Sequence, residues 1–233
     1  MKVHSFLKKK GISPNPYMDQ CFMTSDEIIQ RMVDAAGVGD KIVLEVGAGT
    51  GLLTRKMMYK ASKVVCVEKD VRLCSVLKEL FRDKKVEIVC GDIIRHGFKD
   101  YKTIVGNLPY TIIDWFFKKL LRHDFERSVV TISNKAYKKV MEDKLVSSYL
   151  KIRKVCNVPR TSFWPAPKNH SVLLLIVPEK KNTEIRFFYE KNYNKKVSEV
   201  KMDVNERLAN KKIRDLSGRE LSHLFNSVYA KQE

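Results

Sequence analysis

The chain has 233 residues, which is enough for one α/β domain with a sizeable core and a small appended unit. Its 45 Lys and Arg outnumber 27 Asp and Glu, and the resulting formal charge of +18 is typical of proteins that bind a polyanion such as nucleic acid. Five cysteines without a Cys-x-x-Cys pair argue against a disulfide framework and predict no metal, and the absence of a long apolar run or signal peptide predicts a cytoplasmic protein with no membrane association.

The N-terminal segment is basic. Residues 1–17 are broken by Pro14 and Pro16, which predicts a flexible arm whose lysines can touch phosphates. A helix is expected to follow, because Thr24 and Glu27 have the spacing of a capping box and apolar side chains recur at helical spacing as far as Gly37.

Strands and helices then alternate. Short apolar strands are predicted at residues 41–46, 63–67, 86–90, 103–105 and 128–132, with helices between them. This alternation predicts an α/β fold with a doubly wound, Rossmann-like parallel sheet, whose binding crevice lies at the carboxyl ends of its strands. The residues that follow or close the first four strands should therefore meet in one crevice: Gly47, Glu68, Asp92 and Asn107.

The second half of the chain is expected to complete the domain. A basic helix is predicted at residues 135–144, a helical turn at 147–153, and an antiparallel hairpin from strands at 155–158 and 171–177. Between these strands lies a rigid loop, Ser-Phe-Trp-Pro-Ala-Pro-Lys, at residues 162–168. Trp164 in this loop is left open between packing and RNA contact, whereas the aromatic run 115–117 is predicted to be core.

The α/β domain is thus expected to span residues 18–178, and a small helical C-terminal domain to span 179–233. In the tail, one helical face is predicted from Val197, Val200, Val204 and Leu208, and a second capping box from Ser217 and Glu220. The apolar residues Ile185, Phe187, Phe188 and Tyr189 are expected to dock the tail on the main domain.

The crevice residues indicate a cofactor. Glu45-x-Gly47-x-Gly49-x-Gly51 places a glycine turn after a strand, but its spacing is neither that of the dinucleotide fingerprint nor that of a P-loop. Glu68 closes the next strand, where an acid can hold both ribose hydroxyls, and Asp92 is placed to accept from the amine of adenine. The ligand implied is an adenosine without pyrophosphate, and S-adenosyl-L-methionine fits it best.

The target side of the crevice is predicted at Asn107-Leu108-Pro109-Tyr110. Alone, this could be a strand-to-helix turn with an aromatic staple. After a cofactor site it is the Asn/Asp-Pro-Pro-Tyr type of motif that amino-methyltransferases use. Acceptors on the N6 hydrogens of adenine, here the Asn107 side chain and the Leu108 or Pro109 carbonyl, can aim the nitrogen lone pair at the methyl group. Tyr110, with Phe163, can stack on the flipped base.

On these motifs, the chain resembles the ribosomal-RNA adenine N6,N6-dimethyltransferases over about residues 14–178. The family pattern is matched by Asp19-Gln20-Cys21-Phe22-Met23, by residues 45–51, 68, 91–92 and 107–110, and by Phe163, Pro165, Pro167, Lys168 and Ser171. The resemblance implies a cofactor site formed by these residues: Gln20, Cys21, Met23, Glu45, Gly47, Gly49, Glu68, Lys69, Asp92, Ile93 and Asn107. RNA contacts are expected from four lysines: Lys135, Lys138, Lys139 and Lys168.

Family members dimethylate two adjacent adenines in a hairpin loop near the 3′ end of small-subunit rRNA. The resemblance therefore implies a monomeric enzyme that acts on the immature small ribosomal subunit and helps its maturation. Cys21 and Met23 depart from the usual Asn or His and Leu in the segment that lines the methionine end of the cofactor. Residues 133–135 and 147–152 also depart from the family pattern in regions that should touch RNA, so target choice can differ.

Two alternatives stay open. The sister group that methylates large-subunit rRNA shares the cofactor motifs, but the loop at residues 163–168 favours the small-subunit branch. The departures at Cys21 and Met23 keep open an assembly or transcription factor that has the methyltransferase fold and little activity. Cofactor binding with turnover would separate that factor from an enzyme.

Overall fold

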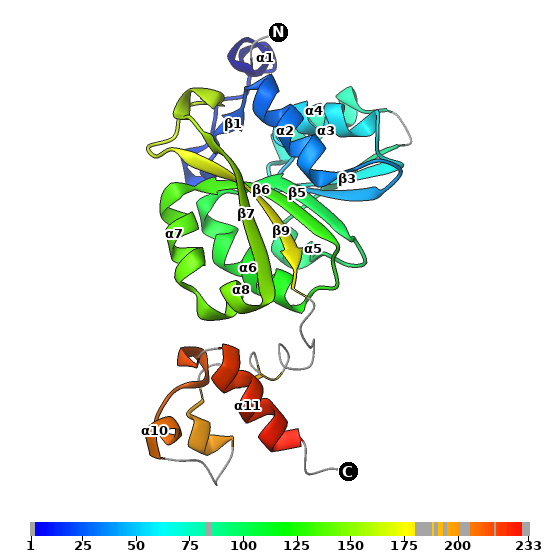
Figure 1. The fold of residues 1–233 in the computed structure, drawn as a ribbon. Helices are drawn as coiled ribbons and strands as arrows, with labels where there is room; N and C mark the ends of the chain where they lie inside the picture. Colours follow the sequence, from blue (N-terminus) through cyan, green and yellow to red (C-terminus); the bar gives the residue numbers. More distant parts are fainter. Residues whose placement is uncertain are drawn as a thin grey trace.

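The computed structural model describes residues 3–82, 85–179, 188, 191–192, 195–200, 206–216 and 218–229. Most of the chain up to residue 179 forms three layers, in which one mixed sheet lies between two groups of helices (Figure 1). This is the Rossmann-like α/β fold predicted from the alternating pattern.

The main sheet has the strand order β4-β3-β2-β5-β6-β9-β7. Five neighbouring strands run parallel: β2 (Ile42–Val46), β3 (Lys63–Glu68), β4 (Val86–Cys90), β5 (Thr103–Asn107) and β6 (Arg127–Ser133). β9 (Ser171–Pro178) runs antiparallel to β6 and to β7 (Leu150–Val158), so the predicted hairpin is confirmed. Because the chain order reverses between β2 and β5, the carboxyl ends of these two strands flank the crevice of the sheet.

Helices cover both faces of the sheet. On one face lie α2 (Asp26–Ala36), α3 (Leu52–Met58) and α4 (Val71–Leu80), whose apolar side chains pack around fully buried Met32 and Met57. On the other lie α5 (Ile93–His96), α6 (Ile113–Arg122), α7 (Asn134–Glu142) and α8 (Lys144–Tyr149). Phe116 and Phe117 are buried there and Trp115 packs against the same cluster, so the core assigned to residues 115–117 is confirmed.

Two predicted boundaries are wrong. Ser25, not Thr24, caps α2, since its Oγ accepts a hydrogen bond from Ile28 N at 3.3 Å. The Thr24 backbone is used elsewhere, because its N–H donates to Ser162 O at 2.7 Å. The helical turn expected at residues 147–153 ends at 149, because pairing with β9 draws the chain into β7 from Leu150 onward.

The N-terminal segment is not a flexible arm. Helix α1 (Val3–Lys9) buries Val3, Phe6 and Leu7 in a cluster that includes Phe22 of β1 (Phe22–Met23) and two residues of α4. These apolar residues share one face of the helix. The flexible arm was predicted from the basic composition of the segment, which does not report this spacing. The ring of His4 lies 4.9 Å from that of Trp164, so Trp164 packs against α1.

Two segments that are far apart in sequence meet above the crevice. β1 pairs antiparallel with β8 (Phe163–Trp164), and Met23 lies opposite Phe163. Short 3₁₀ turns lead into this region: η1 (Pro16–Met18), η2 (Tyr110–Ile112) and η3 (Arg160–Ser162). The N-terminal motif and the proline-rich loop therefore form one two-stranded unit.

Beyond β9, the described elements are η4 (Val197–Glu199), α10 (Glu206–Ala209), η5 (Ile213–Asp215) and α11 (Gly218–Tyr229). α11 contacts α8. The single helical face predicted from Val197 to Leu208 is wrong, since these two residues belong to separate elements. Phe188 is buried against Phe225, with ring centroids 5.6 Å apart, while several predicted positions lie outside the described residues: Ile185, Phe187, Tyr189, Val204 and Ser217.

Candidate active site

A cavity of about 770 Å³ opens at the carboxyl ends of the parallel strands. The four residues predicted to meet there, Gly47, Glu68, Asp92 and Asn107, all line it. So do the other residues predicted for the cofactor and for the target base: Gln20, Cys21, Met23, Glu45, Gly49, Lys69, Ile93, Leu108, Pro109, Tyr110 and Phe163. The topology of the main sheet brings the first four together because each follows or ends a parallel strand on the same edge. Met23 and Phe163 reach the cavity from the separate β1–β8 pair.

The glycine turn after β2 presents bare backbone to this cavity. Gly47 and Gly49 have φ of 72° and 56°, in the left-handed region that favours glycine. A Cβ on Gly47 would meet no atom within 4 Å, so this backbone faces open space, whereas a Cβ on Gly49 would lie 3.1 Å from the Phe22 ring. The turn can therefore take a ligand against Gly47 while Phe22 supports it from behind.

Glu68, at the end of β3, ties the glycine turn to the start of α4. Its Oε2 accepts from Gly49 N at 2.8 Å, and its Oε1 accepts from Asp70 N at 2.9 Å. The side chain is only 7% exposed, and burial raises the pKa of this carboxyl. Each carboxylate oxygen has a second acceptor site, which suits the two hydroxyls of a ribose.

The Glu45 carboxylate lies on the protein side of the glycine turn, not on the side where Gly47 faces open space. Its Oε2 accepts from Thr54 Oγ1 at 2.6 Å and from Cys66 Sγ at 3.3 Å, which links β2 to α3 and β3. The side chain is 1% exposed, and burial raises its pKa from 4.5 to about 7. The structure therefore gives Glu45 a contact with protein groups that support the turn.

Asp92 follows β4 and is an ionised acceptor. Its Oδ1 accepts from Ile94 N at 2.9 Å, and its Oδ2 lies 2.8 Å from the Nζ of exposed Lys69. The hydrogen bond from Lys69 is the main cause that lowers the pKa of Asp92. A carboxylate with unused lone pairs at this strand end can accept from the exocyclic amine of adenine.

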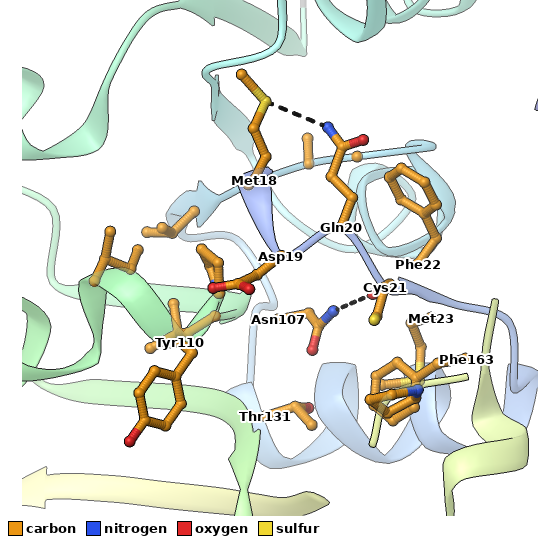
Figure 2. A pocket seen from close by; sticks show the side chains of 18 of the residues that line it. Met18, Asp19, Gln20, Cys21, Phe22, Met23, Asn107, Tyr110, Thr131 and Phe163 are labelled. Carbon is orange, nitrogen blue, oxygen red and sulfur yellow. Dashed lines mark hydrogen bonds between the residues drawn. The ribbon is translucent and has the colours of Figure 1, made fainter. Parts of the chain in front are cut away.

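Asn107, at the end of β5, has a fixed amide orientation. Its Nδ2 donates to the backbone carbonyl of Cys21 at 2.9 Å, which turns the side-chain oxygen away from Cys21 (Figure 2). Because Cys21 contributes its main chain, this contact does not depend on the side chain at position 21. The Asn107 oxygen is the acceptor that the target motif requires.

Asp70 is a residue that the sequence interpretation missed. It accepts from Gln20 Nε2 at 2.8 Å, while Gln20 Oε1 accepts from Asn15 N at 2.8 Å. Hydrogen bonding to Arg72 is the main cause that lowers the pKa of Asp70 to about 2. Gln20 therefore anchors the segment before Cys21, and the only signal in the sequence was an acid at the start of the α4 helix.

The two predicted stacking residues lie on the cavity wall (Figure 2). Tyr110 begins η2 and is 52% exposed, so its ring is accessible. Phe163 is 6% exposed and lies opposite Met23 in the β1–β8 pair. The cavity wall thus contains the exposed ring of Tyr110 and the buried ring of Phe163.

The predicted RNA-binding lysines separate into two groups. Lys168 is exposed and lines the cavity, whereas Lys135, Lys138 and Lys139 are exposed on α7 and do not line it. Lys139 also forms an ion pair with Asp114 at 2.9 Å. Among the described residues, no group of three His, Cys, Asp or Glu side chains could hold a metal ion, and no helix is long and apolar enough to cross a membrane.

The sheet topology and the chemistry of the cavity define a class, the Rossmann-like methyltransferases that use S-adenosylmethionine. Comparison with known proteins narrows that class. Residues 13–230 match the family model for ribosomal RNA adenine dimethylase, and the chain belongs to this family. It is an rRNA adenine dimethyltransferase with S-adenosylmethionine as cofactor.

Archaeal relatives are similar over most of their length. The chain is 32% identical to the probable ribosomal RNA small subunit methyltransferase A of Pyrococcus furiosus over 195 residues, which cover 79% of this chain and 71% of the relative. It is 30% identical to the protein of the same name from Methanosarcina mazei over an alignment of 266 positions, with 97% of each chain covered.

Two solved structures show the same fold. The dimethyladenosine transferase from Plasmodium falciparum has a TM-score of 0.68 and 23% identity, covering 89% of this chain and 98% of that one. The 23S rRNA methyltransferase ErmE has a TM-score of 0.66 and 20% identity, covering 89% and 99%. At these identities the likeness concerns the fold alone.

Proposed function

We propose that this enzyme N6-dimethylates two adjacent adenines in a hairpin loop near the 3′ end of small-subunit rRNA, on an immature small ribosomal subunit. The observation that carries the chemistry is the orientation of Asn107, whose amide nitrogen is held by Cys21 O at 2.9 Å and whose oxygen is therefore left for the target amine. The small-subunit target is supported by the names of the archaeal relatives and by the loop at residues 163–168.

On the target side, Asn107 accepts one hydrogen of the adenine amine and a neighbouring backbone carbonyl accepts the other. We assign the second role to Leu108, because the Pro109 carbonyl already accepts from Ile112 N at 3.3 Å. Two acceptors draw the nitrogen toward tetrahedral geometry and expose its lone pair. The flipped base stacks on Tyr110 and on the edge of Phe163, each worth about 1–3 kcal/mol.

On the cofactor side, bound S-adenosylmethionine supplies an electrophilic methyl group. Glu68 holds the ribose hydroxyls, Asp92 accepts from the adenine amine, and Gly47 offers its backbone. The remaining predicted cofactor residues surround this set: Gln20, Cys21, Met23, Glu45, Gly49, Lys69 and Ile93. The substrate amine loses its proton after it attacks, so the site needs no strong general base.

We also propose that the enzyme acts as a monomer in the cytoplasm and meets RNA through Lys168 and the α7 lysines Lys135, Lys138 and Lys139. All five cysteines are free, which fits a reducing compartment.

The test is methyl transfer from labelled S-adenosylmethionine to immature small subunits, large subunits and free rRNA, with nuclease mapping of the product. We expect dimethyladenosine at two adjacent adenines of the rRNA in small subunits. Asn107→Ala should lower turnover by about 10²–10³-fold because it removes a transition-state acceptor, and should change cofactor affinity far less. Asn226→Ala, at an exposed position of α11 that does not line the cavity, is the matched control and should behave as wild type.

Other outcomes would reject parts of the proposal. Label in large subunits would move the chain to the sister group. No label on any RNA, with cofactor still bound, would favour the assembly-factor alternative. Full activity of Asn107→Ala would remove the role given to that side chain.

A further inference from the structure

One stretch of the chain carries positive charge without any acidic residue. Residues 144–178 contain six Lys or Arg and no Asp or Glu, although the chain as a whole has 27 acids. Five of these basic side chains are exposed in the structure: Lys151, Arg153, Lys154, Arg160 and Lys168. This segment forms β7, the turn η3, the short strand β8 and the loop into β9.

The charges of this segment are not neutralised locally. Among the described residues, none of the five forms an ion pair, whereas basic residues elsewhere on the domain do, as Lys41 does with Glu126, Lys60 with Asp34 and Lys63 with Glu87. Glu27, whose charge acts on Cys156 of β7, is bound by Arg31 at 2.9 Å. The field of the segment therefore acts outward, toward solvent.

These basic residues follow one edge of the sheet toward the catalytic cavity. β7 is the outermost strand of the sheet, so long side chains from both of its faces reach its free edge. It runs from α8 toward the turn that leads to β8, in the same direction as β6 (Figure 1). At that end, Arg160 donates to Pro167 O at 2.6 Å, and Lys168 lines the catalytic cavity. From Lys151 to Val158 the strand extends by about 23 Å.

We propose that this basic edge, defined by Lys151, Arg153, Lys154, Arg160 and Lys168, binds the phosphate backbone of the substrate rRNA and leads the target loop into the cavity. The inference rests on the rRNA substrate proposed above and adds the path of its backbone. Phosphates are the complementary partner because every charged residue of the edge is a cation, and these cations follow an extended strand that leads to the catalytic cavity.

Charged residues on an edge strand can also serve to prevent aggregation, and this role predicts a different result. Lysines on a free edge also discourage pairing with the edge of another sheet. If that were their whole purpose, their removal would cause self-association and would leave RNA binding unchanged. The experiment below separates the two uses.

The test variant is Lys151→Gln, Arg153→Gln, Lys154→Gln in the full chain. The control is Lys41→Gln, Lys60→Gln, Lys63→Gln, which removes the same charge from the ion-paired set at the opposite end of the parallel strands. A second variant, Lys151→Arg, Arg153→Lys, Lys154→Arg, keeps the charge. Binding to free small-subunit rRNA is measured at several salt concentrations, together with cofactor affinity, methyl transfer to immature small subunits and sedimentation.

We expect the test variant to raise the Kd for rRNA by about 10–100-fold and to reduce the slope of log K against log salt by about 2–3, since each lost phosphate contact removes nearly one. KM for RNA should rise while kcat and cofactor affinity stay. The control and the charge-preserving variant should match wild type. An unchanged slope in the test variant, with or without self-association, would overturn the proposal. Label on large subunits, or none, in the wild-type reaction would instead reject the proposed function.

Discussion

Raising the pH from 5 to 8 should destabilise this protein through one buried carboxyl group. Glu45 is 1% exposed, and its pKa in the folded chain is about 7 against a usual 4.5, because burial disfavours the charged form. Well below pH 4.5 the group is protonated in both states and costs nothing. As the pH rises toward 7, the unfolded chain releases this proton while the folded chain keeps it, so folding becomes less favourable.

The size of this effect follows from the two pKa values. A pKa difference of one between the folded and unfolded states corresponds to about 1.36 kcal/mol. Glu45 alone should therefore lower the free energy of unfolding by about 2.5 kcal/mol between pH 5 and pH 8. Glu45→Gln removes the titration and retains the shape of the side chain. The difference in unfolding free energy between this variant and wild type should therefore grow by about 2.5 kcal/mol over that range.

Urea unfolding at several pH values measures the difference. Glu87→Gln on β4 is the matched control, because the hydrogen bond from Lys63 lowers the pKa of Glu87 and its contribution changes only below about pH 5. Other titrating groups cancel in each comparison. A difference between Glu45→Gln and wild type that does not change with pH would show that Glu45 is ionised throughout, and would refute the reasoning.

Two further predictions concern the strands behind the site. Asn107→Asp should be no more active than Asn107→Ala, although Asp occurs in this type of motif. A carboxylate cannot donate a hydrogen bond to Cys21 O and would face this oxygen at about 2.9 Å. Methyl transfer by Asn107→Asp near the wild-type rate would contradict the orientation given to the Asn107 amide. Gly106→Ala should destabilise the fold by about 1–3 kcal/mol, since its Cβ would lie 2.6 Å from Val46 O and would push β2 and β5 apart. Gly39→Ala, where a Cβ meets no atom within 4 Å, is the control in thermal unfolding, and equal melting temperatures for the two variants would disprove the clash.

Local pattern predicted the site well because each of its parts is a short motif at the end of a strand. The glycine turn, Glu68, Asp92 and the Asn107 loop each follow an apolar run whose period and length indicate a buried strand. Once the fold is doubly wound, the carboxyl ends of these strands must share an edge. The sequence therefore determined both the class of fold and the residues that line the cavity.

What only the tertiary structure decided are contacts between segments that no local pattern connects. The burial of α1 on Phe22, the pairing of Met23 with Phe163, and the link from Asp70 to Gln20 join residues at least 15 positions apart. The direction of the Asn107 amide is of the same kind, because it is set by a carbonyl 86 residues earlier in the chain. Hydrophobic periodicity reports which face of an element is buried, and only the packed fold determines which partner covers that face.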